Sequence, residues 1–457
     1  MSARGEWMPD SEVQAETRIA VRAESQATVP ARARATGGRV GGQHAGAGDL
    51  LHLVRSGQAT TRGALQQATG LSRATVGQRL DRLFRAGWLR EGAGGAPDKT
   101  GSPLGGRPSI RLEFDDSHAV VLAADLETRH ARTALLGLTG EIIAEQAGPL
   151  SIEDGPQAVL AELGVRFAEL LRKADRAPAS VCGIGLAVPG PVDSETGRVV
   201  QPPIMPGWDG YDIRGRLRRA FAEQTGGPAG IPVLVDNDAN LMAYGEQRAS
   251  YPECSAFALV KVSTGIGAGV VVDGAVYRGI DGGAGDIGHI RVLEGAGSAE
   301  GAQGAPGTRH ATALCKCGSY GCLAAVASGR AVARRLREAG VPAASGADVR
   351  ALLEAGNPEA VGFAREAGRH VGEVLATVVT LLNPGVLMIA GDLAGTPFLT
   401  GVRELLYQRA LPRSTAHLEV VTSRLGERAA LVGAGTLVVE HLYAPKRVDE
   451  RLAALGV

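Results

Sequence analysis

The chain is poor in aromatic residues and contains no long uninterrupted apolar run. Only 4% of its 457 residues are Phe, Trp or Tyr, and no apolar stretch is long enough to span a bilayer. The first residues also lack the continuous apolar segment of a signal peptide. These absences argue against a membrane protein and against a secreted one, so we expect a cytoplasmic protein.

Cysteine is scarce as well, and its distribution is uneven. Three of the five cysteines fall within eight residues, in the stretch CKCGSYGCL. In a reducing compartment such a cluster indicates a metal site more than a set of disulfides. Cys315, Cys317 and Cys322 would supply three thiolates to a tetrahedral zinc that needs a fourth ligand. His289 and His310 are both candidates, and a site filled in this way would be structural because it leaves no position for water.

The formal net charge is +0, but it is divided unevenly along the chain. Residues 1–113 carry 16 Lys/Arg against 10 Asp/Glu, a balance of +6, so the remaining residues carry −6. Because only residues 1–113 are basic and the rest of the chain is acidic, an anionic partner is expected to bind residues 1–113 alone. Residues 1–47 show no sustained periodicity and are predicted to be a disordered tail.

Residues 48–114 have the pattern of a winged helix-turn-helix domain. Asp49, Thr61 and Ser72 can each cap the start of a helix, and Gly70 suits the end of the second. The third helix carries an apolar stripe at helical spacing, which consists of Val76, Leu80, Leu83 and Phe84. Two strand-like pieces, GWLREG and SIRLEF, would frame a wing that ends in GGRPS.

The polar face of the third helix is predicted to contact double-stranded DNA. Its side chains are of the kinds that donate to phosphates and base edges. The candidates are Ser72, Arg73, Thr75, Gln78, Arg79 and Arg82. We expect base contacts from Gln78 and Arg79, a phosphate contact from Arg82, and a minor-groove contact from Arg107 in the wing. The alternative is a three-helix module that binds protein through a polar surface.

From residue 118 onward, strand-like runs alternate with amphipathic helices such as 157–174 and 358–382, which is an α/β pattern. VDNDAN can bind or deprotonate the hydroxyls of a polyol, or can simply cap a helix. STGIGAGVVVDG suits the close approach of a phosphate, although it also reads as a plain Gly-rich turn. GGAGDIGH adds Asp286 and His289 to a nearby loop.

Taken in order, the motifs VPGPVD, PGW, VDNDAN, STGIGAGVVVDG, AGDIGH and CKCGSYGCL resemble the ROK family of repressors, open reading frames and sugar kinases. The match is closest to its helix-turn-helix regulators, which respond to xylose, glucose or N-acetylglucosamine. The resemblance covers roughly residues 48–443. It implies a two-lobed, actin-like (ribonuclease H-like) sugar kinase fold over residues 118–457, with the sugar in a cleft between the lobes.

The resemblance also implies roles for individual residues. It makes His289 the fourth zinc ligand and places it beside the sugar. Asn237 and Asp238 would contact sugar hydroxyls, with Asp238 at the position of the kinases' general base. Asp286 would stand in for a sugar-binding glutamate that is one methylene longer.

Three departures from the kinase pattern indicate that phosphoryl transfer is lost. The kinases' D-x-G-G-T phosphate loop reads ADLETRHAR here, and a glutamate would repel phosphates that the glycines admit. Ala324 stands where an acidic sugar ligand usually follows GCL, and Ala390-Gly391-Asp392 replaces a glycine pair near the nucleotide. The degenerate nucleotide site comprises Asp125, Glu127, Thr128, Thr264 and Gly265.

The sequence therefore predicts a sugar-responsive transcriptional repressor of carbohydrate metabolism genes, with a degenerate kinase domain as its sensor. We expect a homodimer or tetramer whose paired heads read a pseudo-palindromic operator. One alternative is an active ATP-dependent sugar kinase that carries a DNA-binding head. Another is a regulator that has lost its sugar response and answers to a protein partner.

Overall fold

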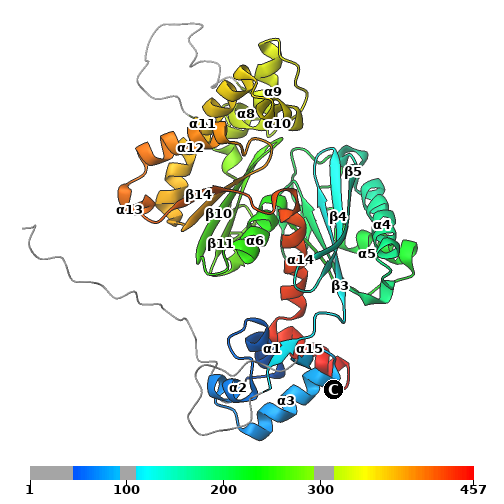
Figure 1. Cartoon of the computed structure of the whole chain (residues 1–457). Helices are drawn as coiled ribbons and strands as arrows, with labels where there is room; N and C mark the ends of the chain where they lie inside the picture. The colour runs from blue at the N-terminus through cyan, green and yellow to red at the C-terminus, as the bar shows by residue number, and fades with distance from the viewer. Residues whose placement is uncertain (1–44, 93–109, 293–312) are drawn as a thin grey trace, which may run out of the picture.

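The computed structural model describes residues 45–92, 110–292 and 313–457. These form a small helical head and two larger lobes (Figure 1). Residues 1–44 of the expected tail, the expected wing with Arg107, and His310 all lie outside the described ranges.

The head contains three helices and a small sheet. The helices are α1 (Ala47–Arg55), α2 (Arg62–Thr69) and α3 (Arg73–Arg85). Strand β1 (Leu89–Glu91) pairs antiparallel with β2 (Leu112–Phe114). The segments expected to be helical or extended are therefore helical or extended in the structure.

The sequence signals at the helix ends act as expected in two of three cases. The hydroxyls of Thr61 and Ser72 each accept a hydrogen bond from a backbone N–H three residues on, at 3.1 Å. The α2 helix ends at Gly70, whose φ of 69° is left-handed. The prediction for Asp49 was wrong, because α1 begins at Ala47 and Asp49 instead accepts from the Gly46 N–H within its first turn, at 2.6 Å.

The two lobes are built on five-stranded sheets of the same topology. In each, three antiparallel strands are followed by two strands parallel to the first. The first sheet contains β3 (Val120–Leu126), β4 (His130–Gly137), β5 (Ile142–Pro149), β6 (Val181–Val188) and β9 (Val233–Asn237). The second contains β10 (Ala256–Val262), β11 (Ile266–Val272), β12 (Ala275–Val276), β13 (Val386–Ala390) and β14 (Glu419–Thr422). A separate hairpin pairs β7 (Val192–Asp193) with β8 (Arg198–Val199).

Helices cover the outer faces of both sheets, as the α/β pattern predicted (Figure 1). On the first lobe these are α4 (Pro156–Lys173) and α5 (Ile213–Thr225). The second lobe carries α8 (Leu323–Ala327), α9 (Gly329–Glu338), α10 (Gly346–Glu354), α11 (Pro358–Leu382), α12 (Thr396–Arg409) and α13 (Pro412–Thr415).

Two helices, α6 (Asp238–Ser250) and α14 (Ala429–Leu442), join the lobes. They pack against each other, α6 also against β10 and β11, and α14 also against β3 and β6. Their crossing depends on glycine, since a Cβ on Gly433 would lie 1.8 Å from the carbonyl oxygen of Leu241. The lobes are therefore held together by two backbones in close approach.

The C-terminal helix α15 (Pro445–Ala454) belongs physically to the head, which the sequence did not reveal. It lies beside α1 in Figure 1, and the Gly48 N–H donates to Asp449 at 3.1 Å. One apolar core unites the head with the C-terminal segment. Its buried members include Leu50, Leu65, Leu80, Trp88 and Leu112 from the head, and Val438, Leu442, Tyr443, Val448 and Leu452 from the C-terminal segment.

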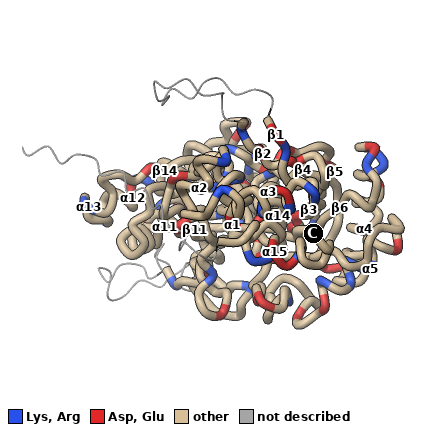
Figure 2. Tube along the Cα trace, turned by 90° about the horizontal axis from the view of Figure 1, so that it is seen from below, with Lys and Arg blue, Asp and Glu red and all other residues tan. Residues whose placement is uncertain are grey.

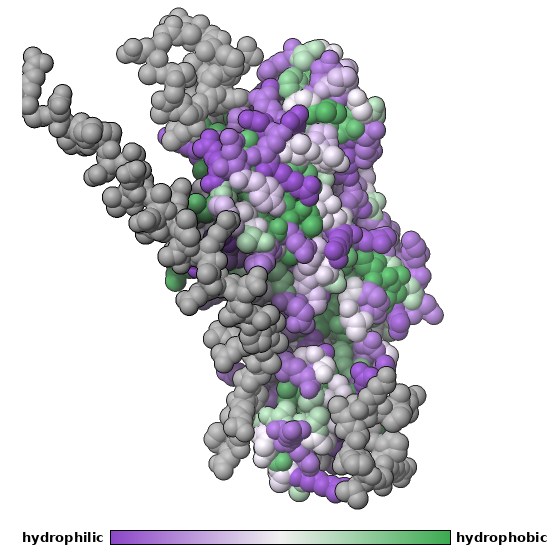
Figure 3. All heavy atoms as spheres, turned by 60° about the vertical axis from the view of Figure 1, so that its left-hand side comes forward, coloured by the Kyte–Doolittle hydropathy of each residue, from purple (hydrophilic) through white to green (hydrophobic). Residues whose placement is uncertain are grey.

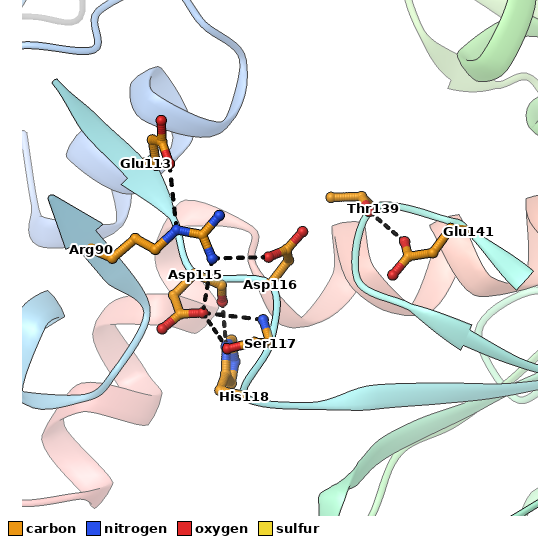
Figure 4. Close-up of polar contacts among 8 residues, drawn as sticks. All are labelled: Arg90, Glu113, Asp115, Asp116, Ser117, His118, Thr139 and Glu141. Atoms are coloured by element: carbon orange, nitrogen blue, oxygen red, sulfur yellow. Dashed lines mark hydrogen bonds and ion pairs between the residues drawn. The ribbon is translucent and has the colours of Figure 1, made fainter. Parts of the chain in front are cut away.

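Polar contacts fix the short linker that connects β2 of the head to β3 of the first lobe (Figure 4). Arg90 of β1 pairs with Asp115 at 3.5 Å and with Asp116 at 3.3 Å. His118 bridges the linker to the C-terminal segment, since one ring nitrogen contacts the Asp115 carbonyl and the other contacts the Tyr443 hydroxyl, each at 2.5 Å. The head is thus connected to the lobes by fixed contacts as well as by the chain itself.

Among the described residues, no helix is both long enough and apolar enough to cross a membrane. On the face shown in Figure 3, hydrophobic and hydrophilic residues of the described part are intermixed.

Candidate functional site

A cavity of about 690 Å³ lies between the two lobes. It brings together ten of the predicted site residues from five separate stretches of the chain. These are Glu127, Thr128, Asn237, Asp238, Thr264, Gly265, Asp286, His289, Cys315 and Cys317. Ala324 also lines the cavity, and its side chain is apolar.

The three clustered cysteines and His289 form one compact group at the wall of this cavity. Their ligand atoms all lie within 4.8 Å of one another. The Sγ atoms of Cys317 and Cys322 are 3.7 Å apart, and Cys315 Sγ is 3.7 Å from His289 Nδ1. Tetrahedral zinc with Zn–S bonds of about 2.3 Å places sulfur ligands about 3.8 Å apart. The donor set and its spacing therefore fit zinc, and the structure brings His289 to the cysteines as the resemblance implied.

Local backbone geometry creates this arrangement. Cys315 begins a tight turn in which the Gly318 N–H donates to the Cys315 carbonyl at 3.0 Å, and the φ of Gly318 is 87°. Such a φ is costly for residues with a Cβ, so the glycine allows the cysteines to converge. Cys322 then pairs by a single bridge with Arg291, which carries the cluster back to the segment holding His289.

Asp238 and Asn237 stand where β9 ends and α6 begins. Asn237 caps α6, because its Oδ1 accepts from the Ala239 N–H at 2.9 Å while its Nδ2 donates to the Gly190 carbonyl at 3.1 Å. The helix-capping interpretation of this motif is thus correct for Asn237. These two hydrogen bonds leave one amide hydrogen of Asn237 available to a ligand.

Two charged pairs in this region were missed by sequence reasoning. Lys261 of β10 lies 2.7 Å from Asp238 Oδ2, with both side chains largely buried. Arg278 binds Asp236 at 2.9 and 2.5 Å, which ties the loop carrying Asp286 to the end of β9. Each pair joins residues more than 20 positions apart in the sequence, so no local motif reports it.

The predicted nucleotide loop is a short connection between two strands and carries a glutamate. The β3–β4 connection consists of Glu127, Thr128 and Arg129 and closes with a Glu127 N–H bond to the His130 carbonyl at 2.8 Å. The exposed Glu127 carboxylate lines the cavity at this end. Asp125 lies buried behind the cavity, and its Oδ1 has no hydrogen-bond partner among the described residues.

Burial raises the pKa of Asp125 to about 7, although the nearby Lys261 charge opposes this. The folded protein therefore binds a proton that the unfolded chain releases near pH 4, and stability is expected to fall as the pH rises from about 4 to 7. Asp125→Asn removes the free-energy penalty of a charged, buried carboxylate, which is roughly 4 kcal/mol at most. Urea unfolding should give the variant a larger advantage over wild type at pH 8 than at pH 5, and an equal difference at both would contradict the assignment.

The predicted DNA-contacting residues lie on α3, in the head and far from the cavity. Figure 2, seen from below, has the head helices in front of the lobes. Arg73 and Gln78 are exposed, whereas Arg79 is half-buried. Ser72 and Thr75 share a hydroxyl contact of 2.8 Å at the start of the helix. Arg82 is partly buried, and its Nε donates to the Val457 carbonyl at 2.9 Å, so it is less free than the sequence suggested.

Two lobes with sheets of one topology, joined by α6 and α14 and enclosing a cavity between them, define the actin-like sugar kinase fold, here preceded by a helical head. The chain belongs to the ROK family, whose model matches residues 121–441.

Individual relatives include both regulators and kinases. The xylose repressor of Caldicellulosiruptor bescii is 24% identical over 86% of this chain and 95% of that protein. A glucokinase of Halalkalibacterium halodurans is 29% identical over 70% of this chain and 94% of the enzyme. The crystal structure of a ROK family transcriptional regulator, a homolog of E. coli MLC protein, aligns with a TM-score of 0.69 at 25% identity, covering 89% of this chain and 98% of that one.

Proposed function

We propose that this protein is a sugar-responsive, DNA-binding transcriptional regulator that represses carbohydrate metabolism genes in the cytoplasm. The observation that carries the proposal is the combination of a polar helix on a separate head with an interlobe cavity that Glu127 and Thr128 line at the predicted nucleotide loop. The xylose repressor of Caldicellulosiruptor bescii aligns with 86% of the whole chain. The glucokinase match covers 70%.

The head would place α3 in the major groove of an operator. Gln78 and Arg73 are the exposed candidates for base edges, and Arg79 and Thr75 border them. Ser72 at the helix start would face a phosphate, and Arg82 would do so only after leaving the Val457 carbonyl. In a homodimer or tetramer, two such heads and their wings would read a pseudo-palindromic site, with Arg107 in the minor groove.

The cavity would hold a neutral sugar through carboxylate and amide groups. Asp238 and Asn237 would bind hydroxyls from the first lobe's edge, while Asp286 and His289 would do so from the facing loop. A zinc ion held by His289, Cys315, Cys317 and Cys322 would fix the shape of that wall. A zinc with four protein ligands supplies structure and no catalysis.

Kinase activity is disfavoured by the partners of Asp238. Its Oδ1 accepts from the Ala239 N–H at 2.8 Å, and its Oδ2 accepts from Lys261 at 2.7 Å. The ammonium group of Lys261 would compete with a sugar hydroxyl for the oxygen that has to accept its proton. Thr264 and Gly265 do line the cavity, which keeps an active kinase as the second candidate function.

Calorimetric titration with D-xylose, D-glucose and N-acetyl-D-glucosamine tests the proposal. We expect at least one of them to bind, and Asp238→Asn to weaken that binding by tenfold or more, because a hydrogen bond to a charged group is worth about 1.5–3 kcal/mol. No phosphorylated sugar should form with Mg-ATP. Turnover that Asp238→Asn abolishes would establish the kinase instead, and absence of binding by every sugar would favour control by a protein partner.

A further inference from the structure

Lys261 is a largely buried lysine in the wall of the interlobe cavity. It projects from β10 into the cavity wall, and only 13% of its side chain is exposed. Burial opposes its charge, but the carboxylates of Asp238, Asp125 and Glu127 outweigh that effect and raise the pKa of the ammonium group. Lys261 is therefore a permanent cation within the cleft.

Three carboxylates surround Lys261, and their charges all favour its positive form. Asp238 lies 2.7 Å away and is 11% exposed. Asp125 is buried, with no hydrogen-bond partner for its Oδ1 in the part of the chain that the structure describes, and Glu127 lines the cavity. Removing the Lys261 cation leaves the buried negative charge of its partner without compensation. In typical proteins this lowers the folding stability by several kcal/mol.

The ammonium group also fixes the direction of Asp238. One carboxylate oxygen is held by the Ala239 N–H at the start of α6, and the other by Lys261, so the group has little freedom to rotate. Each oxygen retains a second lone-pair direction that can accept a hydroxyl hydrogen. A charged acceptor held in one orientation binds a sugar hydroxyl more tightly than a mobile one, because no ordering cost is left to pay on binding.

We propose that Lys261 is a positioning residue of the sugar site, which holds Asp238 as an oriented hydrogen-bond acceptor and makes sugar binding independent of divalent metal. The inference rests on the proposed function, since it concerns the same cavity. In other proteins a divalent ion held by carboxylates can bridge the protein and its ligand. Here a tethered ammonium group already stands in that position.

The test measures the dissociation constant of the best-binding sugar of the three named above, in metal-depleted buffer with and without millimolar Mg²⁺, using zinc-loaded protein. Wild type is expected to change less than twofold on adding Mg²⁺. Lys261→Met should bind the sugar at least tenfold more weakly without Mg²⁺. Lys173→Met is the matched control, because Lys173 is exposed at the end of α4, lies outside the cavity and forms no ion pair among the described residues. It should bind within twofold of wild type.

A double-mutant cycle separates positioning from a general effect on folding. If Lys261 acts through Asp238, adding Lys261→Met to Asp238→Asn should change the sugar affinity by less than twofold. This comparison also applies if Lys261→Met alone does not fold, since the double variant leaves no unpaired charge on Asp238. Wild-type affinity in Lys261→Met, a further tenfold loss in the double variant, or a Mg²⁺ requirement in wild type would each overturn the inference. Absence of sugar binding by wild type would overturn the proposed function along with it.

Discussion

Replacing Cys317 with serine is expected to remove about one zinc ion per chain and to lower the thermal stability of the second lobe. The ligand atoms of the four residues lie within 4.8 Å of one another, so the loss of one leaves an incomplete site. Thiolate zinc sites supply roughly 10 kcal/mol of folding free energy in small domains. The apolar cluster at this loop is small, and its buried members are Cys315, Cys322 and Ala325.

Metal analysis by mass spectrometry and thermal unfolding would measure both effects. Cys254→Ser is the matched control, because Cys254 is half-buried, unpaired with any cysteine and outside the cluster. It should retain the full zinc content. Sugar affinity should fall in Cys317→Ser as well, since His289 and Cys317 line the cavity. Unchanged zinc content in Cys317→Ser would refute the metal site.

Replacing Gln78 and Arg73 with alanine is expected to weaken specific DNA binding by tenfold to several hundredfold. Both side chains are exposed on α3. Each good base contact contributes about 1–3 kcal/mol of discrimination against the wrong base. Binding to scrambled DNA should change much less for Gln78→Ala alone, because a glutamine does not neutralise phosphate charge.

Fluorescence anisotropy at one fixed salt concentration would measure this effect, because phosphate contacts make affinity depend steeply on salt. Gln67→Ala provides the matched control, since Gln67 is an exposed glutamine on the neighbouring helix α2. Equal losses for Gln67→Ala and Gln78→Ala would show that α3 does not read the operator.

Local sequence signals predicted those parts of the fold that depend on interactions between residues close together in the chain. Thr61 and Ser72 cap their helices because a hydroxyl can reach an N–H three residues on, which is a property of the chain itself. The helices expected at 157–174 and 358–382 are α4 and α11, each within one residue of the expected start. The helical period of their apolar residues was enough to identify them.

Other features depend on contacts between distant segments. No sequence motif indicates that α15 completes the head core, because Val448 and Leu452 pack with residues that lie hundreds of positions earlier in the sequence. The antiparallel strands β4 and β5 were not singled out, because β5 is only partly buried and lacks a clear alternating pattern. Among the site residues, the cluster and the VDNDAN motif could be found from sequence. Lys261 could not, because a single lysine in a strand indicates nothing until Asp238 is seen beside it.

Arg82 illustrates the same limit on the DNA side. Its position on the polar face of α3 is evident from helical spacing, but its contact with the Val457 carbonyl is not. The C-terminal segment therefore touches the helix proposed to read DNA. In the same segment, Tyr443 meets His118 of the linker and packs edge-on against Trp88, with 5.9 Å between the ring centres. The head is thus joined to the lobes through α14 as well as through the linker.

The central claim is that the head binds DNA, that the cavity binds a sugar, and that sugar binding changes the affinity for DNA. The most direct test is the anisotropy of labelled DNA from upstream of the protein's own gene, at fixed salt, against scrambled DNA and with each sugar added in turn. The account predicts specific binding whose affinity one sugar changes at least fivefold, the lower range of allosteric coupling. No preference for the upstream DNA over the scrambled DNA, or specific binding that no sugar alters, would contradict it.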